Sequence, residues 1–145
     1  MKNILLLGAT GSIGESVLSV ISQNSEEFNL YGISFNRNIS LGKKIIENFS
    51  PSFVHVENKE AFQKLSQRKS CIVLNGDDDL EDLIKNNDID IIVCATSGFA
   101  GLKATHIAAT TGKKILLANK ESIVAGGDLI LPLAKENNTE IIPID

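Results

Sequence analysis

Residues 4–14 of the chain read Ile4-Leu5-Leu6-Leu7-Gly8-Ala9-Thr10-Gly11-Ser12-Ile13-Gly14. An apolar run that passes directly into glycines is typical of a buried strand ending in a tight turn. Apolar residues then recur at helical spacing as far as Ile21, which predicts a helix. The stretch therefore predicts a strand, a glycine-rich loop and a helix in direct succession, as at the start of a βαβ unit.

The glycines follow the pattern G-x-x-G-x-x-G, which is one residue longer at the first gap than the usual dinucleotide-binding motif. Gly8 permits a sharp exit from the strand, Gly11 lets a pyrophosphate approach the backbone, and Gly14 allows the helix to pack closely on the sheet. The helix N-terminus favours an anion, and Thr10 and Ser12 add hydroxyl donors. We expect a dinucleotide here. A glycine turn that only closes the corner, or a loop for some other phosphate, would have the same pattern.

Further apolar runs alternate with helical patterns along the rest of the chain. Most of these runs are short, β-branched and continuously apolar, as strands are when helices cover both faces of a parallel sheet. The predicted strands are Ile4–Leu7, Leu30–Phe35, Phe53–Val56, Cys71–Leu74, Ile89–Cys94, Lys114–Leu117 and Glu140–Ile142. The alternation predicts an α/β fold with a doubly wound, mostly parallel sheet in one domain over residues 1–145. Such sheets bind ligands beyond the carboxyl ends of their strands.

Composition limits the classes of partner. The net charge is −4, tryptophan is absent and there is one tyrosine, so a nucleic-acid partner is disfavoured. The first apolar run is too short for a signal peptide or a membrane span. Cys71 and Cys94 lie in apolar runs without C-x-x-C spacing, which predicts two buried thiols in a reducing compartment. We therefore expect a cytoplasmic protein with no membrane partner.

The end of the second predicted strand indicates which dinucleotide binds. NAD-binding folds place an acid about 20 residues past the glycine loop, where it accepts a hydrogen bond from the ribose. Here Asn36, Arg37 and Asn38 follow that strand, and no carboxylate stands at its end. Arg37 offers a planar donor fork to a 2′-phosphate, and both asparagines can donate hydrogen bonds. The sequence therefore favours NADP. Arg37 as a solvated or helix-capping loop residue is the alternative.

Two later loops carry polar or small residues beyond strand ends. Thr96-Ser97-Gly98 would let the nicotinamide half of a cofactor lie close to the backbone, although a plain turn fits equally well. Asn119-Lys120-Glu121-Ser122 follows another strand, where substrate-orienting groups belong. Lys120 could neutralise an anionic substrate, and Glu121 could hold Lys120 or the cofactor ribose. The alternative is a helix start with Asn119 as N-cap and Glu121 in the first turn.

The remaining acids and histidines carry weaker signals. Asp145 ends the last strand and is well placed for a metal ion, but one carboxylate does not make a divalent site, and an ordinary loop residue would stand there too. The acidic run Asp77–Asp79 predicts a solvated loop that caps the following helix. His55 and His106 have no partner at metal-site or triad spacing, so we expect surface or packing roles.

Together, the glycine loop Gly8–Gly14, Asn36-Arg37-Asn38 and Leu117-Ala118-Asn119-Lys120-Glu121-Ser122 resemble the 1-deoxy-D-xylulose 5-phosphate reductoisomerases, over essentially all 145 residues. The resemblance implies a Rossmann-like NAD(P)-binding fold. It also implies an NADP-dependent oxidoreductase that isomerises and reduces 1-deoxy-D-xylulose 5-phosphate to 2-C-methyl-D-erythritol 4-phosphate. That reaction belongs to non-mevalonate isoprenoid biosynthesis. The implied cofactors are NADPH and a divalent metal (Mg, Mn or Co), and the full-length family member is expected to be a homodimer.

The same resemblance implies roles for individual residues. Thr10, Gly11, Ser12 and Ile13 would bind the pyrophosphate of the cofactor. Asn36, Arg37 and Asn38 would surround its 2′-phosphate end. Asn119 and Glu121 would contact the cofactor on its other side. Lys120 would contact the sugar phosphate, and Asp145 would be the first metal ligand. In the family the other metal ligands, a lid and the substrate phosphate site come later. We therefore expect an NADPH-binding domain without the catalytic and C-terminal domains, and no turnover by residues 1–145 alone.

Two alternatives remain open at this point. An aspartate-semialdehyde dehydrogenase opens with a similar glycine loop, but its catalytic cysteine lies beyond this region and its pattern does not explain Asn119–Ser122. A non-catalytic NADP sensor would share the loop and Arg37 but would need no metal carboxylate.

Overall fold

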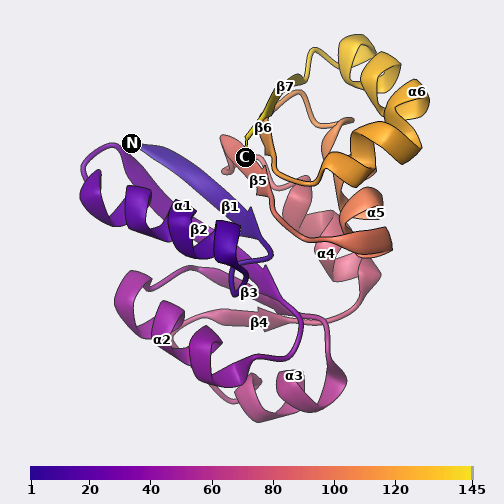
Figure 1. The fold of residues 1–145 in the computed structure, drawn as a ribbon. Coiled ribbons are helices and arrows are strands. Elements are labelled where there is room, and N and C mark those ends of the chain that lie inside the picture. The colour runs from indigo at the N-terminus through magenta and orange to yellow at the C-terminus, as the bar shows by residue number, and fades with distance from the viewer. Residues whose placement is uncertain (145) are drawn as a thin grey trace.

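The computed structural model describes residues 1–144, and at Lys120 it describes the backbone alone. Within that part of the chain, seven parallel strands form one sheet in the order β4-β3-β2-β1-β5-β6-β7 (Figure 1). The strands are β1 (Lys2–Leu7), β2 (Phe28–Phe35), β3 (Phe53–Val56), β4 (Ile72–Leu74), β5 (Ile91–Cys94), β6 (Lys114–Leu117) and β7 (Glu140–Pro143). The predicted doubly wound α/β fold is confirmed, and the predicted strand bounds agree to within two residues.

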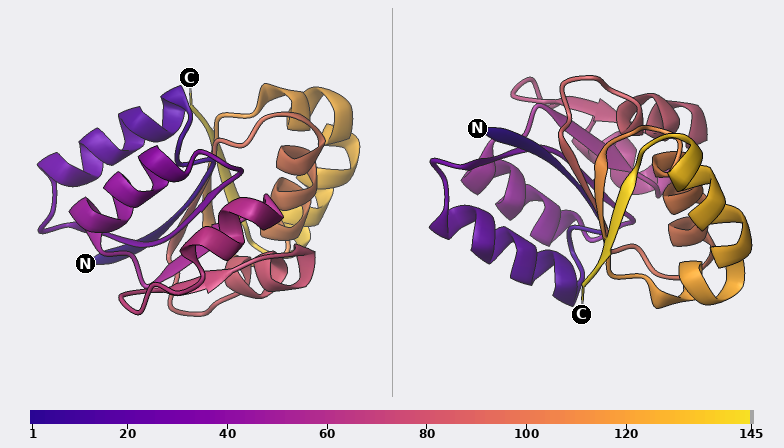
Figure 2. Two further views of the ribbon diagram at one scale, coloured as in Figure 1. Left: turned by 90° about the horizontal axis from the view of Figure 1, so that it is seen from below. Right: turned by 90° about the horizontal axis from the view of Figure 1, so that it is seen from above.

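The helices cover both faces of this sheet (Figure 2). Those in the described residues are α1 (Ser12–Gln23), α2 (Ile39–Phe49), α3 (Lys59–Leu65), α4 (Asp77–Ile84), α5 (Gly98–Ala108) and α6 (Lys120–Glu136). Ile4 and Leu6 of β1 share a core with α1, α2 and α3, whereas Leu5 and Leu7 share a second core with α4 and α5. Because both faces of β1 are covered, its sequence is continuously apolar rather than alternating.

The order of the strands reverses at β1, which lies between β2 and β5. The sheet grows from β1 to β4 on one side, and the chain then crosses back to β5 on the other. Leu7 pairs with Cys94 at the carboxyl ends of β1 and β5. The loops after these two strands lead to α1 and α5 on opposite faces, which opens a crevice between them. Ligands of doubly wound sheets bind at such a reversal, so the fold places the candidate site there.

The structure differs from the sequence prediction at the acidic run Asp77–Asp79. The sequence predicts a solvated loop, but the structure places these residues in the first turn of α4. Gly76, with a φ of +94°, is the N-cap residue and provides the backbone conformation that precedes the helix. Carboxylates in the first turn interact favourably with the positive end of the helix dipole, which explains why the helix begins at Asp77.

The two cysteines are free and buried, as predicted. Burial raises the pKa of Cys94 to about 12 and also raises the pKa of the Cys71 thiol. Both thiols therefore stay protonated near neutral pH and are poor nucleophiles, which fits a packing role. None of the described helices has the length and apolar character needed to cross a membrane.

Gly14 provides a test of the packing at the start of α1. A Cβ atom at Gly14 would lie 2.5 Å from the Ala9 carbonyl oxygen and 2.6 Å from that of Gly8, so the close contact is with the loop rather than with the strands. We expect Gly14→Ala to lower the free energy of unfolding by about 1–3 kcal/mol, because backbone must move. Urea unfolding followed by circular dichroism measures this.

Gly127→Ala is the matched control, because a Cβ atom at this helical position meets nothing closer than 3.8 Å. It should raise stability by about 0.5–1 kcal/mol through the higher helix propensity of alanine. Equal stabilities for the two variants would contradict the packing described for Gly14.

Candidate functional site

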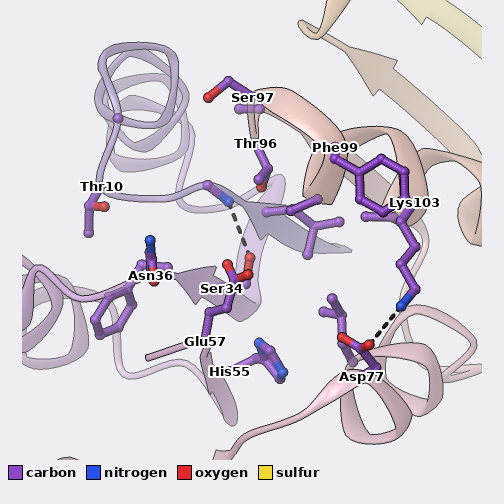
Figure 3. Close-up of a pocket in the computed structure, with 18 of the residues that line it drawn as sticks. Thr10, Ser34, Asn36, His55, Glu57, Asp77, Thr96, Ser97, Phe99 and Lys103 are labelled. Atoms are coloured by element: carbon purple, nitrogen blue, oxygen red, sulfur yellow. Dashed lines mark hydrogen bonds and ion pairs between the residues drawn. The ribbon is translucent and has the colours of Figure 1, made fainter. Parts of the chain in front are cut away.

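A groove of about 780 Å³ lies beyond the carboxyl ends of β1 to β5 (Figure 3). The glycine loop forms one end, the residues after β2 and β3 form one side, and the β5–α5 loop with α5 forms the other. The residues after β4 close the end opposite the glycine loop. The groove therefore coincides with the reversal of strand order and includes Thr10 and Gly11 of the predicted site.

The glycine loop is held against its neighbours by backbone contacts. The Gly8 and Ala9 N–H groups donate to the Ser34 carbonyl oxygen at 3.1 and 2.9 Å, and Gly8 also donates to Ser34 Oγ at 3.2 Å. Gly8 has a φ of +84°, and a Cβ atom there would lie 2.7 Å from the backbone of Ala95. Glycine is therefore required at position 8 both for its conformation and for this close approach.

The start of α1 is suited to an anion. Its N-cap residue is Gly11, which has no side chain to bond the first N–H groups of the helix. A Cβ atom at Gly11 would meet nothing nearer than the Gly8 carbonyl oxygen at 3.7 Å, so the space above this glycine is open. Ser12 and Ile13 open the helix but are not among the residues that line the groove. The helix N-terminus thus presents donors and a positive dipole end without an internal acceptor.

The residues predicted to surround a 2′-phosphate divide into separate roles. Asn36 lines the groove, whereas Arg37 and Asn38 are exposed and do not line it. Asn38 is the N-cap of α2, and its side chain accepts a hydrogen bond from the Leu41 N–H at 3.2 Å. Among the described residues no acid forms an ion pair with Arg37, so its guanidinium is free to turn toward a ligand.

The sequence analysis missed two charged groups beside Asn36. Glu57 and Lys59 line the groove, because β3 lies next to β2 and ends at the same edge. The Glu57 N–H donates to the Phe35 carbonyl at 3.0 Å, and the Asn58 N–H donates to the Asn36 carbonyl at 2.9 Å. The end of β2 has no carboxylate, but Glu57 at the end of the adjacent β3 brings one to the same part of the groove. In a doubly wound sheet the third strand lies next to the second, and this order would have indicated that Glu57 lies near Asn36.

Asn119 and Glu121 join two loops rather than line the groove. The Asn119 side chain is 6% exposed, and its Nδ2 donates to the Thr96 carbonyl oxygen at 2.9 Å. Glu121 Oε2 accepts a hydrogen bond from the Gly98 N–H at 3.1 Å. Asn119 is the N-cap residue of α6, but its side chain makes no capping bond. Both residues therefore hold the β5–α5 loop, whose Thr96 and Ser97 do line the groove.

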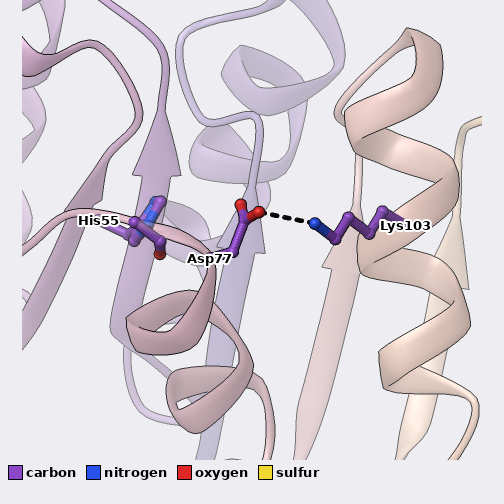
Figure 4. A network of polar contacts seen from close by, with 4 residues as sticks. His55, Asp77 and Lys103 are labelled. Carbon is purple, nitrogen blue, oxygen red and sulfur yellow. Dashed lines mark hydrogen bonds and ion pairs between the residues drawn. The ribbon is translucent and has the colours of Figure 1, made fainter.

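A polar cluster closes the end of the groove opposite the glycine loop (Figure 4). Lys103 Nζ of α5 lies 2.6 Å from Asp77 Oδ2 of α4. The hydrogen bond and charge of Lys103 lower the pKa of the Asp77 carboxyl, and Asp77 raises the pKa of the Lys103 ammonium. His55 is 3% exposed, and its Nε2 lies 2.8 Å from the Gly76 carbonyl oxygen. These residues come from β3, α4 and α5, and only the tertiary structure brings them together.

Two predicted site residues lie outside this description. Asp145, the predicted metal ligand, is outside the described residues, and so is the side chain of Lys120. Within residues 1–144, no group of three or more histidine, cysteine or acidic side chains is arranged to hold a metal ion.

Comparisons with known proteins place this groove in context. A family model described as 1-deoxy-D-xylulose 5-phosphate reductoisomerase matches residues 4–127. The chain is 43% identical over 150 residues to the enzyme of that name from Clostridium perfringens, with all of this chain and 39% of that protein covered. The chain therefore spans well under half the length of that curated relative.

Solved structures agree with this comparison. One crystal structure of DOX-P reductoisomerase, in complex with NADPH, fosmidomycin and magnesium, matches with a TM-score of 0.92 and 34% identity, covering 100% of this chain and 36% of that one. The Zymomonas mobilis enzyme in complex with NADPH matches with a TM-score of 0.92 and 31% identity, covering 99% of this chain and 38% of that one.

The bond between Asn119 and Thr96 allows a test of the loop junction. Asn119→Asp replaces the buried Nδ2 donor by a carboxylate oxygen that faces the Thr96 carbonyl oxygen. We expect the free energy of unfolding to fall by about 1–3 kcal/mol at pH 7, because two acceptors meet and a charge is buried. Denaturant unfolding at pH 7 and pH 4 measures the effect, which should shrink at pH 4 as the carboxyl is protonated. A loss that does not change with pH would contradict this explanation.

Proposed function

The chain belongs to the 1-deoxy-D-xylulose 5-phosphate reductoisomerase family, and from that premise we propose that residues 1–145 form its NADPH-binding domain. The observation that carries this proposal is the open space above Gly11 at the N-terminus of α1, at the point where the strand order reverses. A pyrophosphate placed there would accept hydrogen bonds from the first N–H groups of α1 and from the Thr10 hydroxyl. NADPH supplies a hydride when bound, and these residues hold and orient it.

The charges around Asn36 support a cofactor with a 2′-phosphate. Lys59 and Glu57 line this part of the groove with one charge of each sign, and Arg37, which follows Asn36 in the chain, is exposed beside it. The guanidinium of Arg37 can form two parallel hydrogen bonds with a phosphate, which a ribose hydroxyl does not allow. Asn36 lies between the glycine loop and these charges and is placed to contact the ribose. We therefore propose NADPH rather than NADH as the preferred cofactor.

The reaction of the complete protein is also part of the proposal. Relatives bear the name of an enzyme that acts on 1-deoxy-D-xylulose 5-phosphate, and we propose the same reductive isomerisation, within isoprenoid biosynthesis, for the protein that contains this chain. Lys120 would contact the sugar phosphate, and Asp145 would be one ligand of a magnesium, manganese or cobalt ion. One carboxylate does not complete a divalent site, so we expect residues 1–145 alone to bind cofactor without turnover.

The nicotinamide side of the cofactor, the location and the oligomeric state complete the proposal. Asn119 and Glu121 would contact the cofactor on its nicotinamide side, through the loop that they already hold against Thr96 and Gly98. Two free thiols fit the reducing cytoplasm, which we propose as the location. We also propose a homodimer for the complete protein. Membership of the family favours this function over an aspartate-semialdehyde dehydrogenase or a non-catalytic NADP sensor.

Titration of the chain with NADPH and with NADH, followed by calorimetry, tests the proposed function. We expect saturable binding of NADPH and weaker binding of NADH. Gly11→Val should weaken both by about tenfold or more, because a branched Cβ would enter the space proposed for the pyrophosphate; tenfold corresponds to about 1.4 kcal/mol. Gly127→Ala, in an open helical position away from the groove, should bind as the wild type does. Unchanged binding by Gly11→Val would remove the loop from the site.

Arg37→Asp tests the choice between the two cofactors. The substitution removes a charge-assisted hydrogen bond to the 2′-phosphate and adds a repulsive charge, so NADPH affinity should fall by about ten- to a hundredfold. NADH affinity should stay near its wild-type value, because NADH carries no 2′-phosphate. Arg68→Asp makes the same change in net charge at a residue that pairs with Glu47 and does not line the groove. It should change neither affinity appreciably. An equal loss for both cofactors in Arg37→Asp would contradict the assignment.

A further inference from the structure

The outer face of α6 carries large apolar side chains that are open to solvent. Val124, Leu129 and Leu131 are 87%, 61% and 48% exposed. By contrast, every exposed residue of α2, α3 and α4 is polar or charged. Single exposed apolar residues are normal on a protein surface, but a group of large ones is typical of an interaction surface.

The inner face of α6 is already packed. Ile130 and Ala134 are buried there, and Leu102 of α5 and Ile141 of β7 pack against them. In Figure 1, α6 lies at the margin of the fold, beside α5 and beyond it. The helix therefore has its full set of contacts with the sheet without using the outer face.

The space above the outer face is open as well. Val124, Gly127 and Leu131 follow one another at helical spacing and so lie on one side of α6. A Cβ atom at Gly127 would meet only the side chains of Ile123 and Leu131, which belong to the same helix. Another element can therefore approach this side of α6 without displacing any described residue.

The edge strand β7 indicates how such an element would bind. The Ile144 N–H donates to the Leu117 carbonyl oxygen at 2.9 Å, so this N–H points toward β6. Because directions alternate along a strand, Pro143 faces the outer edge of the sheet. Proline has no N–H group, so a further strand would lack a donor at that position. The surface beside β7 is therefore suited to side-chain packing on α6 rather than to the addition of a strand.

The length of the relatives indicates what the occupant is. This chain covers 39% of the Clostridium perfringens enzyme and 36% and 38% of two solved reductoisomerase chains, so more than half of each has no counterpart here. Ile144 lies beside Leu117, three residues before α6 begins at Lys120. The four residues from Lys120 to Val124 span about 6 Å along the helix. Since an extended chain advances about 3.3–3.6 Å per residue, a segment that follows Ile144 reaches the outer face within a few residues.

From these observations we propose that, in the complete protein, residues beyond 145 pack on the outer face of α6 through apolar side chains that contact Val124, Leu129 and Leu131. Asp128 lies on the same face, and it has no ion pair among the described side chains. A carboxylate that becomes covered needs a partner charge, so we expect a lysine or arginine opposite it. This inference rests on membership of the family and does not depend on the proposed binding of NADPH.

The contact would connect the later part of the protein to the groove. Asn119 and Glu121, at the start of α6, hold the β5–α5 loop through the Thr96 carbonyl oxygen and the Gly98 N–H. A segment docked on α6 therefore fixes this loop relative to the rest of the complete protein.

Hydrogen exchange of the complete protein, with and without Val124→Asp, tests this contact. A carboxylate placed in an apolar contact weakens it, so amides in at least one peptide beyond residue 145 should exchange about tenfold faster or more. Valine and aspartate have similar helix propensities and Val124 is largely exposed, so the urea midpoint of residues 1–145 alone should not change. Leu129→Asp, at a second exposed position, should give the same increase in exchange.

Val20→Asp is the matched control, because Val20 is 53% exposed on α1 and its exposed neighbours on that helix are polar. It should leave exchange beyond residue 145 unchanged. Faster exchange confined to residues 1–145 outside α6 would identify a second copy of this domain as the occupant and would overturn the proposal. No change in any peptide beyond α6 would show a solvated face and would also overturn it. NADPH titration reports on the proposed function separately, since Val124 does not line the groove.

Discussion

The groove depends on the close approach of two backbones, that of Gly8 after β1 and that of Ala95 and Thr96 after β5. No Cβ atom fits between them, and the φ of Gly8 lies in the left-handed region. The same turn is held from the other side by hydrogen bonds from Gly8 and Ala9 to Ser34 at the end of β2. The ends of three neighbouring strands are thus joined by backbone, and the N-terminus of α1 is aimed at the space above them. A side chain at position 8 would separate β1 from β5 at the place where the ligand is expected.

The polar groups that line the groove differ along its length. The start of α1 provides donors and a positive dipole end without a charged side chain in contact. Glu57 and Lys59 line the groove near Asn36 with one charge of each sign, and Arg37 is exposed next to Asn36 in the chain. The opposite end has the paired charges of Asp77 and Lys103 between apolar walls.

Several side chains act on the groove without lining it. Asn38 begins α2, Asn119 holds Thr96, and Glu121 accepts from the Gly98 N–H. Each of these bonds fixes a loop whose other residues face the groove. Their polar chemistry and their place after strands made them candidates, and the family resemblance implied that they contact the cofactor. In the structure these three side chains do not line the groove. Their contact with a ligand stays a prediction.

The local sequence was sufficient to predict the helices and strands and the glycine loop between β1 and α1. Continuous apolar runs and helical spacing reflect a covering layer of any composition, and the positive φ of Gly8 and the contacts of Gly14 with Gly8 and Ala9 are local, so they can be recognised in a single chain. The close approach of Gly8 to Ala95 depends on the tertiary structure. Glu57 beside Asn36, and His55, Asp77 and Lys103 at the far end of the groove, could not be recognised in this way. These residues come from β3, α4 and α5 and are far apart in the chain. They meet because the order of the strands and the crossing of α4 over the sheet bring their ends to one edge, and that arrangement follows from packing the whole chain rather than from any short stretch of it.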